Sequence, residues 1–136
     1  MTEHDNPHTA PDWPALRAKA INARANAYSP YSKFPVGAAG LCADGRVVTG
    51  CNVENASYGL GLCAECVLVG NFVASGGGHL IAVTVTGPRP GALMPCGRCR
   101  QVLLEHGGPQ LLIDAEPAPV TVAELLPHAF SAQDLP

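Results

Sequence analysis

The sequence predicts an α/β fold with three α/β/α layers, in which helices cover both faces of a single mixed sheet of about five strands. Segments with helical periodicity alternate with strand-like segments in the order α-β-β-α-β-α-β, followed by a last short strand or helix. The 136 residues suffice for one domain with one core, and neither an internal repeat nor a long linker divides them. We expect residues 1–11 to form a flexible N-terminal tail and residues 12–136 to form the domain.

The first half of the chain predicts a helix followed by a β-hairpin. Asp12 can cap a helix in which small and apolar residues recur at i, i+4, i+7 and i+11 from Leu16, which places them on one face. Two apolar runs, 36–43 and 46–53, are joined by an Asp-Gly pair typical of two-residue hairpin turns. The small residues of the first run indicate close packing beneath a helix.

The second half predicts two more helices, each followed by a strand. Residues 62–75 have helical spacing and are apolar almost all round, so we expect this helix to be sandwiched. Residues 80–86 alternate β-branched side chains, as a buried strand does. After a Pro- and Gly-rich loop, a short helix carries Cys99 and ends at a pair of glycines. Residues 110–114 then predict a strand, and 120–126 a last short strand or helix.

Composition indicates self-association and argues against two classes of partner. Only 14% of the residues are charged and 47% are apolar, whereas about 25% charged residues are typical. We therefore expect copies of the chain to cover one another, the alternative being a monomer with a large core. The net charge is −3 and the eight Lys and Arg are scattered, so we expect no nucleic-acid partner. No apolar run is long enough to predict a membrane span.

Six cysteines without a secretory signal pattern predict metal binding or catalysis in a reducing compartment, with the cytoplasm as the expected location. Cys63, Cys96 and Cys99 fall where two helices are expected to begin, and a helix N-terminus stabilises the thiolate that binds a metal. Soft thiolates select Zn²⁺. Three sulfur ligands leave the fourth position open for water, which distinguishes a catalytic zinc site from a structural one.

Glu65 is the candidate catalytic residue. It follows Cys63 by two residues, so its carboxylate can lie beside the metal without binding it. Zinc deaminases share this template of a His or Cys ligand, a Pro-Cys-x-x-Cys pair and a nearby Glu that acts as general acid and base. Attack of water on C4 of cytosine requires protons to be moved to N3 and to the departing ammonia, which one carboxylate can do in turn.

Cys66 allows a second interpretation of the cysteines. Together with Cys63, Cys96 and Cys99 it forms a CxxC…CxxC pattern, which is typical of a closed four-sulfur zinc site in a non-enzymatic module. The spacer between the two pairs is longer than the ~15–20 residues usual in such sites. A thioredoxin-like redox role would require each pair to have its own strand–helix context.

From residue 12 to about residue 135 the sequence resembles the small, homotetrameric cytidine deaminases. The matching motifs are Tyr31-Ser32-Lys33-Phe34-Pro35-Val36-Gly37-Ala38-Ala39, Asn52-Val53-Glu54-Asn55-Ala56-Ser57-Tyr58-Gly59-Leu60, Cys63-Ala64-Glu65, Pro95-Cys96-Gly97-Arg98-Cys99-Arg100-Gln101 and Leu125-Leu126-Pro127-His128-Ala129-Phe130. The resemblance implies a cytidine deaminase-like fold with one Zn²⁺ per subunit. It also implies hydrolytic deamination of free cytidine and 2′-deoxycytidine to uridine and 2′-deoxyuridine, with release of ammonia, in pyrimidine salvage.

The resemblance also implies the substrate contacts. Asn52 and Glu54 lie at i and i+2 of an expected strand, so both leave the same face, and the family assigns them to the ribose. Two polar residues on a solvated face are the alternative. The resemblance places Phe34 and Ala64 beside the nucleoside. Active sites would be shared between subunits, with contacts from a neighbour by Ala56, Tyr58 and Phe130; for the last of these, a C-terminal apolar anchor is the alternative.

One position departs from the family pattern. Many relatives have Arg directly after the catalytic Glu, where it donates hydrogen bonds to the ligand thiolates, and this chain has Cys66. Three thiolates and Zn²⁺ sum to −1, so helix N-termini, Arg98 or Arg100 would have to compensate the charge. The nearest rival function is a deaminase of a cytosine-containing antibiotic of the blasticidin S type, which shares the metal motif but does not require Asn52 and Glu54.

Overall fold

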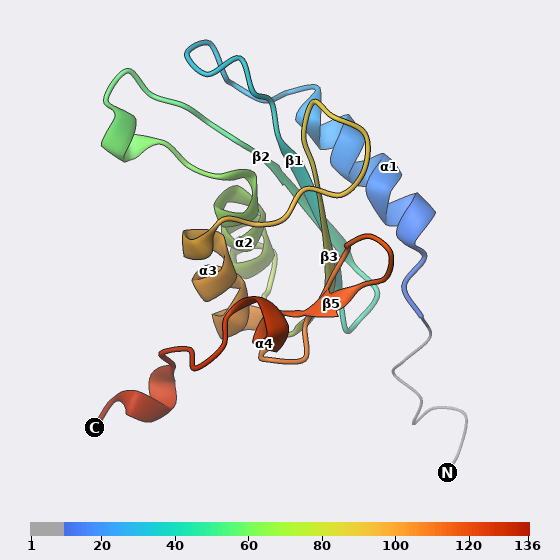
Figure 1. Ribbon diagram of the computed structural model, residues 1–136, viewed down its shortest axis with the longest axis vertical. Helices are drawn as coiled ribbons and strands as arrows, with labels where there is room; N and C mark the ends of the chain where they lie inside the picture. The colour runs from blue at the N-terminus through green and yellow to red at the C-terminus, as the bar shows by residue number, and fades with distance from the viewer. Residues whose placement is uncertain (1–9) are drawn as a thin grey trace.

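The computed structural model describes residues 10–136, within which the strands form one five-stranded sheet in the order β2-β1-β3-β4-β5 (Figure 1). The strands are β1 (Gly37–Cys42), β2 (Val47–Cys51), β3 (Leu80–Thr86), β4 (Leu112–Ile113) and β5 (Val120–Thr121). The helices are α1 (Trp13–Arg24), α2 (Ala64–Ala74), α3 (Gly97–Gly107) and α4 (Val122–Leu125), with 3₁₀ turns at Tyr58–Leu60 and Ala132–Asp134. β3 and β4 are parallel, and the other described pairs are antiparallel, so the sheet is mixed.

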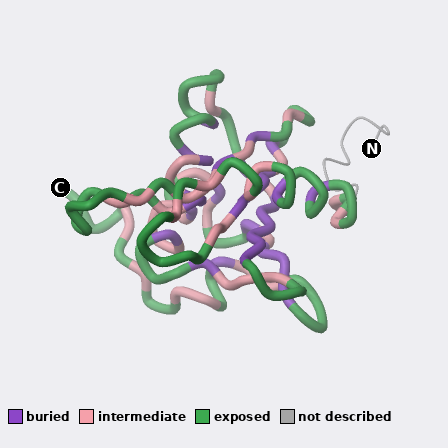
Figure 2. The backbone as a smooth tube through the Cα atoms, turned by 90° about the horizontal axis from the view of Figure 1, so that it is seen from above, coloured by how far each residue is buried: buried purple, intermediate pink, exposed green. Residues whose placement is uncertain are grey.

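Helix α1 covers one face of the sheet, and α2 and α3 cover the other (Figure 1). Successive residues of a strand face opposite sides, and this alternation divides the core. Ala39 of β1 packs with α1, whereas Ala38 packs with α2 and α3. In Figure 2 the buried segments gather toward the centre of the molecule. The expected α/β fold with one mixed sheet and helices on both faces is confirmed.

Helix α1 begins where the sequence predicts and ends earlier. The Asp12 carboxylate caps it by accepting a hydrogen bond from the Ala15 N–H at 3.1 Å. Leu16 and Ala20 are buried, as their spacing predicts. The helix stops at Arg24 because the chain then turns toward the end of β2, where the Tyr28 N–H donates to the Asn52 carbonyl at 3.0 Å.

Two glycines let the helices touch the sheet backbone. A Cβ at Gly37 would lie 2.0 Å from the Ala20 carbonyl oxygen of α1. A Cβ at Gly50 would lie 2.4 Å from both the Ala64 carbonyl oxygen and the Leu68 nitrogen of α2. The expectation that small residues mark close helix packing is therefore confirmed for β1. On β2, Gly50 allows the same close approach of a helix.

Replacing Gly50 by Ala should lower the free energy of unfolding by about 3 kcal/mol, because the new methyl group meets backbone atoms that cannot rotate away. Urea unfolding followed by circular dichroism measures the loss. Gly70→Ala on α2, the helix that packs on Gly50, is the control, since no atom lies within 4 Å of a Cβ built there. That control should stabilise the protein by up to about 1 kcal/mol. Equal midpoints for Gly50→Ala and the unaltered protein would contradict the close approach.

The boundaries of other helices and strands differ from expectation where residues distant in sequence pair with one another. The helix expected from residue 62 begins at Ala64, because Leu62 pairs with Val53 through two backbone hydrogen bonds of 2.9 Å. That pairing also takes Val53 out of β2. α2 is not sandwiched within one chain, since Val73 is 54% exposed. The segment 120–126 forms both a strand and a helix, with the Thr121 hydroxyl capping α4.

Neither 3₁₀ turn was expected from the sequence. Residues 1–9 of the expected N-terminal tail lie outside the described residues, and the next two precede α1 without regular structure. Among the helices described, none combines the length and the apolar character that crossing a membrane requires.

Candidate active site

The two helix N-termini on one face of the sheet bring three cysteine sulfurs together. Cys63 is the N-cap of α2, Cys96 is the N-cap of α3, and Cys99 lies in the first turn of α3. The Sγ atoms of Cys63 and Cys96 are 3.9 Å apart, and those of Cys96 and Cys99 are 3.5 Å apart. All three sulfurs lie within 4.8 Å of one another. Tetrahedral zinc with Zn–S bonds of ~2.3 Å places its sulfurs ~3.8 Å apart, so the cluster fits this ion.

Cys66 is not part of the cluster. Within residues 10–136, the group of His, Cys, Asp and Glu side chains that could hold a metal consists of the three predicted ligands. The four-sulfur site that the CxxC…CxxC pattern allowed is therefore not formed. All six cysteines are free, so no disulfide competes for the sulfurs.

Local contacts hold both ligand segments in place. Cys63 directly follows Leu62, which the pairing with Val53 fixes against the end of β2. Cys96 follows the buried Pro95, whose carbonyl oxygen accepts a hydrogen bond from Arg100 Nε at 2.8 Å. The positive ends of two helix dipoles thus point toward the sulfurs and partly offset their charge as thiolates.

The protein environment alone does not favour three thiolates. Burial raises the pKa of the Cys63 thiol and of the Cys99 thiol. Burial also opposes ionisation of Cys96, but hydrogen bonds from the Cys99 N–H and thiol and from the Cys63 thiol outweigh it, so the pKa of Cys96 is lowered. A shared cation is what would hold all three as thiolates, as metal ligation requires.

Glu65 lies beside this cluster in the first turn of α2 and is only 4% exposed. Burial raises the pKa of its carboxyl group, and hydrogen bonding to its own backbone N–H and, to a smaller extent, to the Cys99 thiol partly offsets that effect. A carboxyl group whose pKa is moved toward neutrality can both accept and return a proton. The position and environment of Glu65 therefore suit a general acid and base.

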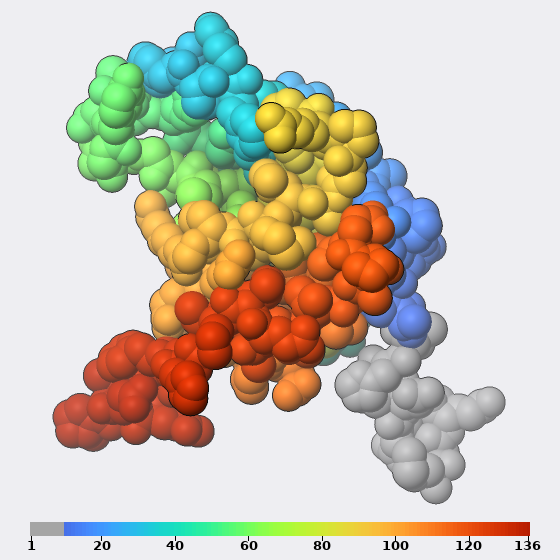
Figure 3. All heavy atoms as spheres, in the orientation of Figure 1, coloured from blue at the N-terminus to red at the C-terminus, as the bar shows by residue number. Residues whose placement is uncertain are grey.

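A cavity of about 440 Å³ opens over the cysteines. In Figure 3 a hollow is visible between the green atoms of the segment before α2 and the yellow-orange atoms of the segment before α3. The sequence-predicted residues that line the cavity are Cys63, Glu65, Cys96, Asn52, Glu54, Tyr58 and Ala64. Sequence reasoning missed Val36, Val53, Gly61, Leu62, Leu93 and Met94. The last two stand just before the Pro-Cys-x-x-Cys segment, and that proximity was the signal that could have found them.

Three predicted contacts do not line this cavity within one chain. The Phe34 side chain is 41% exposed and its ring lies next to Gly87, at the edge of the site. Ala56 is exposed, and Phe130 is 59% exposed on the C-terminal segment that extends away from the domain (Figure 1). Tyr58 lines the cavity mouth but is itself 82% exposed, touching Tyr31 edge to face.

Asn52 and Glu54 line the cavity together, as their spacing predicts, but their polar atoms also hold a neighbouring loop. The Asn52 amide contacts the backbone of Phe34 and Val36. The Glu54 carboxylate accepts from the Ser32 hydroxyl and from backbone N–H groups, and these hydrogen bonds lower its pKa.

Arg98 and Arg100, the two arginines expected to balance the thiolate charge, have different surroundings. Arg100 donates to the carbonyl oxygens of Pro95 at 2.8 Å and of Leu125 at 2.9 Å, so its hydrogen bonds support the backbone near the ligands. Arg98 is exposed and lines the cavity. Cys66, where many relatives have Arg, is half-buried on α2.

Comparisons with known proteins agree with this chemistry. Residues 14–114 match the family described as "Cytidine and deoxycytidylate deaminase zinc-binding region". A cytidine deaminase from Mycobacterium tuberculosis is 59% identical over 125 residues, covering 92% of this chain and 94% of that protein. A cytidine deaminase from Halalkalibacterium halodurans is 41% identical over 129 residues, covering 91% of this chain and 98% of that protein.

Solved structures are also similar. A crystal structure of cytidine deaminase from Mycobacterium tuberculosis matches with a TM-score of 0.87 and 59% identity, covering 89% of this chain and 98% of that one. One from Burkholderia pseudomallei matches with a TM-score of 0.78 and 42% identity, covering 96% of this chain and all of that one. With a three-cysteine cluster beside a buried glutamate and these matches along almost its whole length, the chain belongs to the cytidine deaminase family of zinc-binding hydrolases.

Proposed function

We propose that the protein hydrolyses the C4 amino group of free cytidine and 2′-deoxycytidine, yielding uridine, 2′-deoxyuridine and ammonia, as a step of pyrimidine salvage. The observation that carries this proposal is the buried Glu65 carboxyl group beside three sulfurs at the floor of a cavity of about 440 Å³. Zinc held by Cys63, Cys96 and Cys99 would act as a Lewis acid that lowers the pKa of a water molecule and so supplies the nucleophile at neutral pH.

Glu65 would carry the protons. Its carboxylate takes a proton from the attacking water and delivers it to N3 of the cytosine ring while the water oxygen bonds to C4. A second proton from the same oxygen passes through Glu65 to the amino group, and the C4–N4 bond breaks to release ammonia. The low exposure of Glu65 supports this role, because a site closed to bulk water strengthens each charge interaction.

Specificity for a nucleoside would come from other residues that line the cavity. Asn52 and Glu54 would contact ribose hydroxyls, and Ala64 would contact the base; that all three line the cavity supports this assignment. Phe34 would close the site from the edge where it lies next to Gly87. A site that hydrogen-bonds a hydroxyl rejects analogues that lack it, because its own polar groups are then left unpaired.

We further propose a homotetramer with one Zn²⁺ per subunit and active sites shared between subunits. Ala56, Tyr58 and Phe130 would then contact the site of a neighbour. Their exposure within one chain supports this assignment, as does the low proportion of charged residues. Sedimentation should give a mass near 56 kDa, four times the 14.0 kDa of one chain. The free thiols support a cytoplasmic location.

An ultraviolet assay of the purified protein tests the reaction. Cytidine and deoxycytidine should be converted, while cytosine should show a kcat/KM at least about 10³-fold lower because it lacks the sugar. Blasticidin S is the control for the antibiotic-deaminase alternative and should not be converted. Turnover of cytosine or blasticidin S at the rate of cytidine would overturn the assignment to nucleosides, and activity that survives complete zinc removal would overturn the mechanism.

A further inference from the structure

The loop from Tyr31 to Val36 borders the catalytic cavity, and side chains hold its backbone. Every residue of this loop except Pro35 has a backbone N–H, and each of these groups has an acceptor. One bond, from Lys33 to the Ser29 carbonyl at 3.1 Å, is an ordinary backbone turn. The other four go to side-chain oxygens. The shape of the loop therefore depends largely on particular side chains; the Val36 carbonyl also accepts from the Asn52 N–H at 3.2 Å, next to the β1–β2 ladder.

The first of these side chains is Glu54, and Ser32 extends its reach. Glu54 Oε1 accepts from the N–H groups of Tyr31 and Ser32, each at 3.0 Å. The Ser32 hydroxyl donates to Glu54 Oε2, and its oxygen accepts from the Phe34 N–H at 3.0 Å. The hydroxyl thus links the carboxylate to the backbone of the residue whose ring lies at the edge of the site.

The second side chain is Asn52, whose amide spans Pro35. Its Oδ1 accepts from the Val36 N–H at 2.8 Å, and its Nδ2 donates to the Phe34 carbonyl at 2.9 Å. Both polar ends of the amide are therefore engaged by the loop. Val36 lines the catalytic cavity, so this contact sets one wall of the site.

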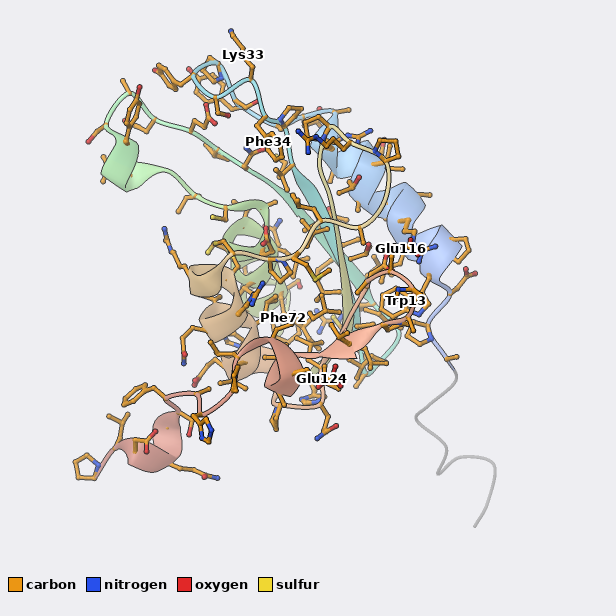
Figure 4. The ribbon with its side chains drawn as sticks, in the orientation of Figure 1. Trp13, Lys33, Phe34, Phe72, Glu116 and Glu124 are labelled. Atoms are coloured by element: carbon orange, nitrogen blue, oxygen red, sulfur yellow. The ribbon has the colours of Figure 1, made fainter. Side chains whose placement is uncertain are left out.

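Strain in the loop makes these contacts necessary. Lys33 has φ of 58°, the left-handed region that residues with a Cβ rarely adopt. Figure 4 shows Lys33 at the outer tip of the loop and Phe34 nearer to the sheet. The turn at Lys33 directs the following residue inward, and it persists when the surroundings hold it.

We propose that Ser32 and Asn52 are positioning residues that hold the Tyr31–Val36 loop in its substrate-ready shape, Ser32 through Glu54 and the Phe34 N–H, and Asn52 through the backbone on both sides of Pro35. This inference deepens the proposed function and rests on it. It gives Asn52 a role that exists before any sugar binds, in addition to the sugar contact. It also assigns a role to a serine hydroxyl that need not touch the substrate.

Hydrogen exchange without substrate tests the loop directly. In Ser32→Ala, the amide protons of Phe34 and Val36 should exchange about tenfold faster than in the unaltered protein, because the loop opens more often. Ser32→Thr keeps a hydroxyl and should restore protection to within about twofold. Ser29→Ala is the matched control in the same region, since no hydrogen bond of the Ser29 hydroxyl is found within residues 10–136.

Steady-state kinetics with cytidine tests the consequence. Ser32→Ala should raise KM by at least about fivefold, since the variant loses both hydrogen bonds of the hydroxyl, while kcat changes less than twofold. For Asn52→Ala, 2′,3′-dideoxycytidine separates the loop contact from a contact with the 2′- or 3′-hydroxyl, because it lacks these two hydroxyls and keeps only the 5′-hydroxyl. The KM for this analogue should still rise about fivefold in the variant, since the loop contact is lost with either substrate.

The outcomes are distinct. Unchanged amide exchange in Ser32→Ala would overturn the proposal, and so would faster exchange with an unchanged KM, which would make the contact merely structural. Threonine behaving like alanine would show that the hydroxyl is not responsible. If Asn52→Ala affected cytidine alone, with normal amide exchange, its role would be the sugar contact only. A protein that exchanges as expected but does not deaminate cytidine would refute the proposed function and leave the loop contacts standing.

Discussion

Replacement of Glu65 by Gln should lower kcat for cytidine by about 10³- to 10⁴-fold, the upper part of the ~10²- to 10⁴-fold range by which one general acid–base group accelerates a reaction. The upper end is expected because the same carboxylate is assigned each proton transfer. Gln has nearly the same shape, and Glu65 is not one of the three sulfur ligands. The bound zinc should therefore remain near one ion per subunit. Stopped ultraviolet assays with zinc quantified by plasma emission measure both quantities.

Measuring activity and bound zinc on the same variant distinguishes a catalytic role of Glu65 from a role in holding the metal. Lost activity with retained zinc identifies Glu65 as a catalytic group, whereas loss of both would mean that the substitution damaged the metal site. Activity within tenfold of the unaltered protein would refute the assignment. Cys66→Ser is a useful neighbour, since Cys66 is next in sequence but lies outside the cluster. It should keep both zinc and activity.

Replacement of Cys99 by Ala should remove the zinc and with it essentially all activity, with kcat/KM falling by at least about 10³-fold because the Lewis acid is lost. Cys99 is fully buried and its sulfur lies 3.5 Å from that of Cys96. Alanine offers no ligand atom, and the two remaining sulfurs cannot complete a three-ligand face. Metal analysis after dialysis measures the expected loss.

Thermal unfolding provides a second measurement on the same variant. A ligand that binds the folded state alone stabilises it by mass action, so added zinc should raise the melting temperature of the unaltered protein after metal removal. It should not do so for Cys99→Ala. Zinc retained by Cys99→Ala would contradict the site described above, and zinc lost from Cys66→Ser would indicate the four-sulfur arrangement instead.

The parts of the site that could be predicted are those encoded in short stretches of sequence. Cys63 and Glu65 are two residues apart, and Cys96 and Cys99 form one helical turn, so local geometry almost determines where their side chains meet. The strand at 80–86 was predicted with its observed limits because its alternation is complete within the segment. The mixed five-stranded sheet followed from the order of such segments.

The parts that could not be predicted depend on segments that meet only in the fold. Leu62 was expected in a helix because its spacing suits one, but pairing with Val53 holds it extended. The i and i+2 spacing indicated that Asn52 and Glu54 share a face, and it could not show that the neighbouring loop bonds to both. Phe34 and Phe130 remain predictions, since neither lines the cavity of one chain and Phe130 would act in the site of a neighbour.

The absence of a side chain at Gly50 limits how this scaffold can change its substrate range. Because α2 rests directly on the β2 backbone there, the catalytic floor can neither sink nor tilt to admit a bulkier nucleoside. Enlargement has to come from the segment before α2, which also lines the cavity through Glu54, Tyr58 and Gly61. Directed evolution toward modified pyrimidines should therefore accumulate changes in the 54–62 segment and leave the glycine untouched.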